Sequence, residues 1–134
     1  MKGYVRESNS PNAIAILEQA GFPLLLSHFH EIEIPNAIRL KRFRLEISKQ
    51  EEEVAIRDFL ADIKAGRLIK PDYDLAQVFR RAEELSSLYS GQIGTRSLDL
   101  LHVAAALDAR CSVFSSFDAR QRKLAGLCGL TVLP

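Results

Sequence analysis

The stretch TRSLDLLHVAAALDARCSVFSSFD, residues 95–118, decides the predicted fold. Its first half predicts a helix that is apolar on nearly every side, so we expect this helix to be buried between layers. Its second half predicts a short strand over residues 112–117 that ends in small polar residues. One acid lies at each end of this unit, because Asp99 falls in the first turn of the helix and Asp118 directly follows the strand.

These two acids point to a hard cation. A buried carboxylate such as that of Asp99 is costly unless something pairs with it. Asp118 stands at the carboxyl end of a strand, where open α/β sheets form their ligand crevice. Two carboxylates that reach one crevice suit Mg²⁺ or Mn²⁺. Each acid also has a structural alternative, since Asp99 would complement the helix dipole and Asp118 would cap the next helix.

Length and composition set modest bounds. The chain has 134 residues, of which 47% are hydrophobic and 26% charged, so we expect one globular domain over residues 1–134. Its net charge of +1 gives no global field for nucleic acid, so any RNA contact must come from local patches. We find neither a membrane-length apolar run nor a signal-peptide core, and this predicts a cytoplasmic protein without membrane contact.

The two cysteines are predicted to be structural. Cys111 and Cys128 both lie in apolar surroundings of the sequence. Two residues in such positions favour buried free thiols over a disulfide framework or a zinc site.

Capping signals place the predicted helices. Ser48 with Glu51 three residues later forms a capping box for a helix that ends at Gly66. Pro35 fits a helix over residues 29–45 only near its start or at a kink. The other predicted helices cover residues 10–20, begin at Asp74, and extend from Asp118 to Cys128.

Short apolar strands separate these helices. They are predicted over residues 23–27, 68–70, 112–117 and 130–133. Strands that alternate with helices in this way indicate an α/β fold with a mainly parallel sheet.

Four segments of the chain resemble a PIN domain, as found in the VapC toxins of bacterial toxin–antitoxin pairs. GTRSLDLLHVAAAL (94–107) and FSSFDARQRKLAGLCGLTVLP (114–134) look like its C-terminal half. SHFHEIEIPNAIRLKRF (27–43) resembles its second conserved block, and KGYVRE (2–7) looks like the segment after its first strand. The resemblance implies a three-layer α/β/α fold over the whole chain and a metal-dependent ribonuclease whose partners are RNA and an antitoxin.

Carried over by position, the resemblance also implies the site. Asp99, Asp118 and Glu33 would hold Mg²⁺ or Mn²⁺ and act as the catalytic acids, although Glu33 alternatively reads as a surface acid of an amphipathic helix. The supporting and RNA-binding groups would be Ser116, Thr95, His102, Arg96, Arg120 and Arg122. His102 also fits a satisfied core histidine, and the HxHE pattern from His28 to Glu31 is a weaker zinc candidate.

The chain departs from the family pattern at its start. The family's first central strand and the aspartate at its end are expected to be missing, since no residue from Met1 to Arg6 is acidic. We therefore expect weak metal binding and low or absent activity. The strands on either side of the empty slot would favour a homodimer. The alternative function is a catalytically impaired PIN-like remnant that serves as a binding or oligomerisation module.

Overall fold

The computed structural model describes residues 15, 21 and 23–133 of the chain. The predicted helix over residues 10–20 and the expectations for residues 2–7 lie outside the described residues. The chain divides into two compact units, residues 1–70 and residues 71–134, and each is described by itself. The expectation of a single domain over residues 1–134 stays a prediction.

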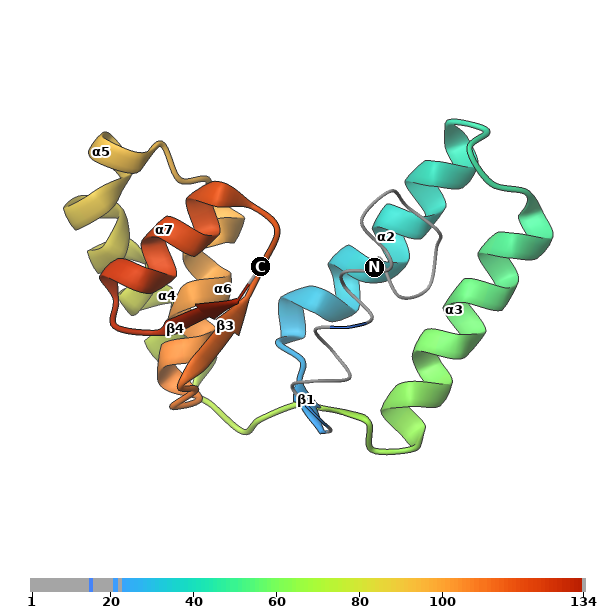
Figure 1. Ribbon diagram of the computed structural model, residues 1–134, viewed down its shortest axis with the longest axis horizontal. Helices are drawn as coiled ribbons and strands as arrows, with labels where there is room; N and C mark the ends of the chain where they lie inside the picture. Colours follow the sequence, from blue (N-terminus) through green and yellow to red (C-terminus); the bar gives the residue numbers. More distant parts are fainter. Residues whose placement is uncertain (1–14, 16–20, 22, 134) are drawn as a thin grey trace. The chain divides into compact units, whose positions relative to one another are not determined.

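In residues 23–70 the first unit combines two short parallel strands with two helices, α2 and α3 (Figure 1). Its elements are β1 (Leu24–Leu25), α2 (His28–Phe43), α3 (Lys49–Lys64) and β2 (Leu68–Ile69). β1 pairs with β2 in parallel, with Leu24 opposite Leu68 and Leu25 opposite Ile69. Helices α2 and α3 pack against each other and bury Ile38 and Phe59.

The boundaries of α3 confirm the capping prediction. The Glu51 backbone N–H donates to the Ser48 hydroxyl at 3.2 Å, and the Ser48 N–H donates to the Glu51 carboxylate at 2.7 Å. The hydrogen bond from the Ser48 backbone lowers the pKa of Glu51, since it favours the ionised carboxylate. At the other end, Gly66 takes a left-handed φ of 71°, which closes the helix as predicted.

Replacing Ser48 with alanine is expected to lower the free energy of unfolding by about 1 kcal/mol. The substitution removes the side chain that accepts the Glu51 N–H. Ser48→Asp is the matched control, because aspartate caps a helix equally well. Thermal denaturation followed by circular dichroism measures both variants, and an unchanged Tm for Ser48→Ala would show that this cap contributes nothing.

Pro35 does not lie near the start of its helix, which was one of the two placements that the sequence allowed. It sits in the interior of α2, well past the first turn where a proline costs little. Proline has no N–H to donate to the carbonyl of Glu31, four residues earlier, so this helix lacks one backbone hydrogen bond. The other predicted placement, at a kink, stays a prediction.

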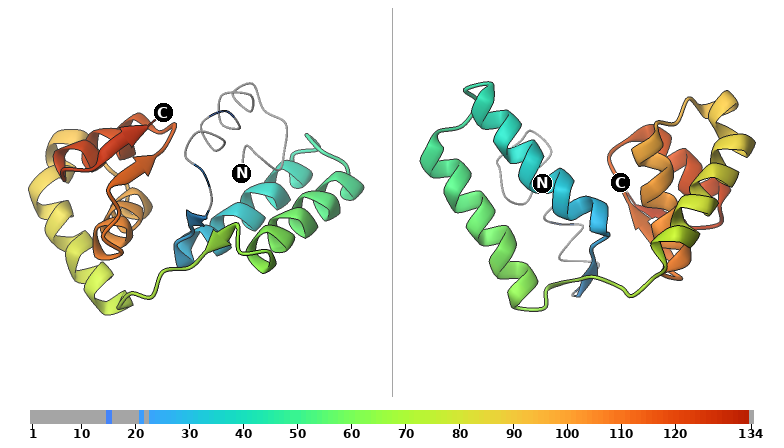
Figure 2. Two further views of the ribbon diagram at one scale, coloured as in Figure 1. Left: turned by 60° about the horizontal axis from the view of Figure 1, so that its bottom comes forward. Right: turned by 180° about the vertical axis from the view of Figure 1, so that it is seen from behind.

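The second unit has three principal helices and two parallel strands (Figures 1 and 2). In chain order its elements are α4 (Leu75–Leu85), a π-helical turn (Ser86–Ser90), α5 (Gly91–Ile93), α6 (Ser97–Asp108), β3 (Val113–Ser115), α7 (Ala119–Leu127) and β4 (Thr131–Leu133). The register of β3 against β4 places Val113 opposite Thr131 and Ser115 opposite Leu133. Helix α6 packs against α4 and α7, and α7 also covers both strands.

The core of this unit lies where α4, α6 and α7 meet. The predicted apolar helix over residues 97–108 is confirmed, and it buries Val103, Ala104 and Ala105 completely or almost so. Val78 from α4 and Leu124 from α7 complete the contact. The interior position of α6 places its first turn, and with it Asp99, at the boundary between core and surface.

The predicted fold class is confirmed as α/β with parallel strands. The strands are shorter than the sequence indicated, because only two or three residues of each form ladder pairs. Within the described residues, we find no helix long and apolar enough to cross a membrane. The absence of a first central strand stays a prediction.

Candidate functional site

Asp99 is a buried carboxylate at the start of α6. Its side chain is 6% exposed, and its Oδ2 accepts the backbone N–H of Arg96 at 2.9 Å. The first turn of a helix favours an anion there, because the unpaired N–H groups carry partial positive charge. Among the described residues, no lysine, arginine or histidine forms an ion pair with Asp99.

Hydrogen bonds join Asp99 to the start of α7. The side-chain amide of Gln121 donates to Asp99 Oδ1 at 2.9 Å, and its Oε1 accepts the hydroxyl of Ser116 at 2.8 Å. The Ser116 Oγ in turn accepts the backbone N–H of Asp118 at 3.1 Å. We call these four residues, Asp99, Gln121, Ser116 and Asp118, the acid network. It brings together two predicted acids and the predicted supporting hydroxyl.

Asp118 caps α7, as the structural alternative predicted. Its Oδ1 accepts the backbone N–H groups of Arg120 at 2.8 Å and Gln121 at 3.3 Å. The residue is exposed, and its Oδ2 has no hydrogen-bond partner among the described residues. A capping aspartate therefore retains one oxygen that is accessible to a ligand.

The candidate ligand atoms of the acid network suit a hard divalent cation. They are all oxygen, which Mg²⁺ and Mn²⁺ prefer. A carboxylate offers about four lone-pair sites, and the two hydrogen bonds to Asp99 occupy only two of them. Because none of the described residues forms an ion pair with the buried Asp99, a bound cation would supply a compensating charge.

Three exposed arginines flank the acid network. Arg96 precedes α6, while Arg120 and Arg122 lie in the first turn of α7. None of the three has an acidic partner among the described residues, although Arg120 Nη1 donates to the carbonyl of Gly94 at 3.4 Å. Unpaired guanidinium groups near carboxylates are suited to phosphate oxygens.

The remaining predicted supporting residues of this unit are Thr95 and His102. The Thr95 hydroxyl shares a 2.7 Å hydrogen bond with the hydroxyl of Ser90. His102 is buried on α6, one turn after Asp99. The role of both residues at the site stays a prediction.

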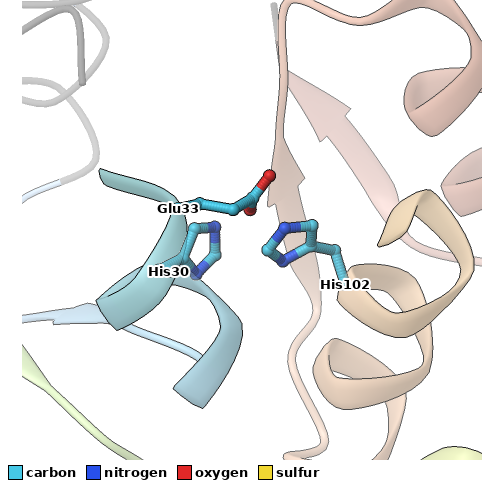
Figure 3. A group of neighbouring side chains, drawn as sticks. All are labelled: His30, Glu33 and His102. Atoms are coloured by element: carbon cyan, nitrogen blue, oxygen red, sulfur yellow. The ribbon is translucent and has the colours of Figure 1, made fainter. Parts of the chain in front are cut away.

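Glu33 belongs to the first unit and lies on α2. Figure 3 shows the side chains of Glu33 and His30 on the same side of this helix, with ligand atoms within 4.8 Å of each other. The Nδ1 of His30 accepts the backbone N–H of Ser27 at 3.1 Å, so in the neutral ring the proton lies on Nε2. Glu31, from the HxHE pattern, pairs with Lys70 at 3.1 Å. The assignment of Glu33 as a ligand stays a prediction.

Sequence reasoning missed Gln121. Its partner Asp99 lies 22 residues away, and only the packing of α7 against α6 brings the two side chains together. Only the position of Gln121 could have drawn attention to it. It lies three residues after the predicted cap Asp118 and therefore in the first turn of the next helix.

The cysteines are free, as the sequence predicted, but they are less buried than expected. Cys111 and Cys128 are both free and half-buried. Burial raises the pKa of each thiol, and a raised pKa disfavours the reactive thiolate form.

Comparison with known proteins gives one match. A family model described as PIN domain matches residues 4–127. No curated protein and no solved structure matches the chain.

Proposed function

Because the chain belongs to the PIN domain family, which is in general a family of nucleases, we propose that it is a divalent-metal-dependent ribonuclease of the VapC toxin type. Its substrate would be single-stranded or structured RNA. The cofactor would be Mg²⁺ or Mn²⁺.

One observation carries this proposal. Asp99 keeps a carboxylate in a site where only 6% of the residue is exposed, and hydrogen bonds orient it while no cationic side chain neutralises it. Burying an ionised carboxylate costs free energy unless something pairs with it, and the helix start and two hydrogen bonds offset only part of that cost. A divalent cation would pair with the remaining charge.

In this proposal, some residues of the second unit hold the cation and others hold the RNA. Asp99 and the unpaired Oδ2 of Asp118 would hold the cation, and Arg96 and Arg120 would hold phosphate groups of the RNA. When bound, a divalent ion neutralises charge on the phosphate oxygens and provides a deprotonated water for in-line attack. Glu33 is proposed as the third carboxylate of the reaction.

The toxin assignment also carries proposals about partners and location. It implies an antitoxin that holds the enzyme inactive and an RNA substrate that shares the cytoplasm with it. We likewise propose the homodimer that the sequence led us to expect.

A binding module without turnover is the second candidate, and a specific observation favours it. Both acids already have structural roles. Asp99 accepts the Arg96 backbone N–H at the start of α6, and Asp118 caps α7. Carboxylates that serve as caps need no metal to explain them.

Titration of Mn²⁺ by calorimetry, together with cleavage of a labelled single-stranded RNA, distinguishes these candidates. We expect a dissociation constant no tighter than about 1 mM, the weak end of protein sites for hard cations. We also expect slow cleavage that stops when a chelator is added. Metal binding without any cleavage would favour the binding module, and the absence of metal binding would overturn the ribonuclease proposal.

A further inference from the structure

The side-chain amide of Gln121 joins the two helices that carry the acids. It extends from the first turn of α7, donates to Asp99 Oδ1 at 2.9 Å and accepts from the Ser116 hydroxyl at 2.8 Å. Glutamine is the residue type that can do both at once, because its amide has a donor at one end and an acceptor at the other.

The partners of Gln121 fix the orientation of its amide. Asp99 is a carboxylate and can only accept, so Nε2 must face it. Oε1 then faces Ser116, whose hydroxyl hydrogen is available because its oxygen accepts the N–H of Asp118. A flipped amide would place Oε1 against the Asp99 carboxylate, two acceptors facing each other, and would lose the hydrogen bond to Asp99.

Three successive hydrogen bonds in the acid network point toward Asp99. The Asp118 N–H donates to Ser116, Ser116 donates to Gln121, and Gln121 donates to Asp99. Hydrogen bonds arranged head to tail polarise one another, and here the negative end of the chain is the Asp99 carboxylate. The arrangement both holds this carboxylate in one rotamer and stabilises its charge.

We propose that Gln121 is a positioning residue for divalent-metal binding, and this inference rests on the proposed function. With Oδ1 fixed by Gln121 and Oδ2 fixed by Arg96, the unused lone pairs of Asp99 keep a constant direction toward a cation. When a residue that orients a metal-binding carboxylate is replaced, metal affinity or activity typically falls by about 10-fold to 100-fold.

Gln121→Leu tests the inference, since leucine has a similar size and neither donor nor acceptor. Gln77→Leu is the matched control, because Gln77 is exposed on α4 of the same unit. In a Mg²⁺ titration followed by NMR at constant ionic strength, we expect Gln121→Leu to bind Mg²⁺ about 10-fold more weakly or worse. Gln77→Leu should bind Mg²⁺ with unchanged affinity.

A second measurement uses the wild-type chain and does not depend on the folding of any variant. The side-chain amide resonances of Gln121 should shift during the Mg²⁺ titration with the same midpoint as the backbone resonance of Asp99. Unmoved amide resonances, or equal affinities of Gln121→Leu and wild type, would overturn the role of Gln121 while leaving the ribonuclease proposal in place. Absence of any Mg²⁺-dependent shift near Asp99 and Asp118 would overturn both.

Discussion

Replacing Asp99 with asparagine is expected to reduce RNA cleavage at least about 100-fold and to abolish measurable Mn²⁺ binding at millimolar concentrations. Asparagine keeps the shape of the side chain and one acceptor oxygen for the Arg96 N–H, so the start of α6 should persist. It lacks the negative charge that holds a divalent ion. The stabilisation that such an ion gives to developing phosphate charge is several kcal/mol, and about 2.7 kcal/mol already corresponds to 100-fold.

Asp74→Asn is the control for this experiment. Asp74 caps α4 of the same unit through its contact with the Ala76 N–H, so the control makes the same chemical change at another helix start. Its metal affinity and cleavage rate should equal those of the wild type. Circular dichroism should show that both variants are folded, and full activity of a folded Asp99→Asn would remove Asp99 from the mechanism.

Phe59→Ala is expected to lower the free energy of unfolding of the first unit by about 3–5 kcal/mol. Phe59 lies on α3, is 1% exposed, and is among the largest fully buried side chains of the described residues. Its removal takes away the transfer free energy of the ring and leaves a cavity that the surrounding helices fill only in part. Urea denaturation with a probe in the first unit measures the loss.

Phe43→Ala provides the matched comparison. Phe43 is the same residue type at the end of α2, also in the first unit, but it is 83% exposed. Truncation there should change the free energy of unfolding by about 0.5 kcal/mol or less. Equal losses for the two variants would show that Phe59 does not contribute as a core residue.

Sequence patterns predicted the parts of the fold that depend on neighbouring residues. Ser48, Asp74 and Asp118 were predicted as caps, and each accepts the backbone N–H groups that its position requires. The sequence likewise placed the ends of α3 and α7 at Gly66 and Gly129, which both take a positive φ. These signals are local, because a cap needs only the two or three residues after it.

Features that depend on distant partners could not be read from the sequence. Gln121 is an ordinary polar residue until α7 packs on α6 and places its amide beside Asp99. Pro35 contradicts local preference inside α2, yet the helix continues through it. The ladder lengths of the strands depend on their partners, which is why the predicted strand over residues 112–117 forms pairs only from Val113 to Ser115.

The π-helical turn at Ser86–Ser90 has a consequence for how many residues this part of the chain must contain. A π turn accommodates one residue more than an α turn, and each residue advances an α-helix by about 100° around its axis. Without the extra residue, the hydroxyl of Ser90 would face about 100° away from its partner Thr95, which stands just before α6. The Ser90–Thr95 hydrogen bond therefore depends on the number of residues in the turn between α4 and α6.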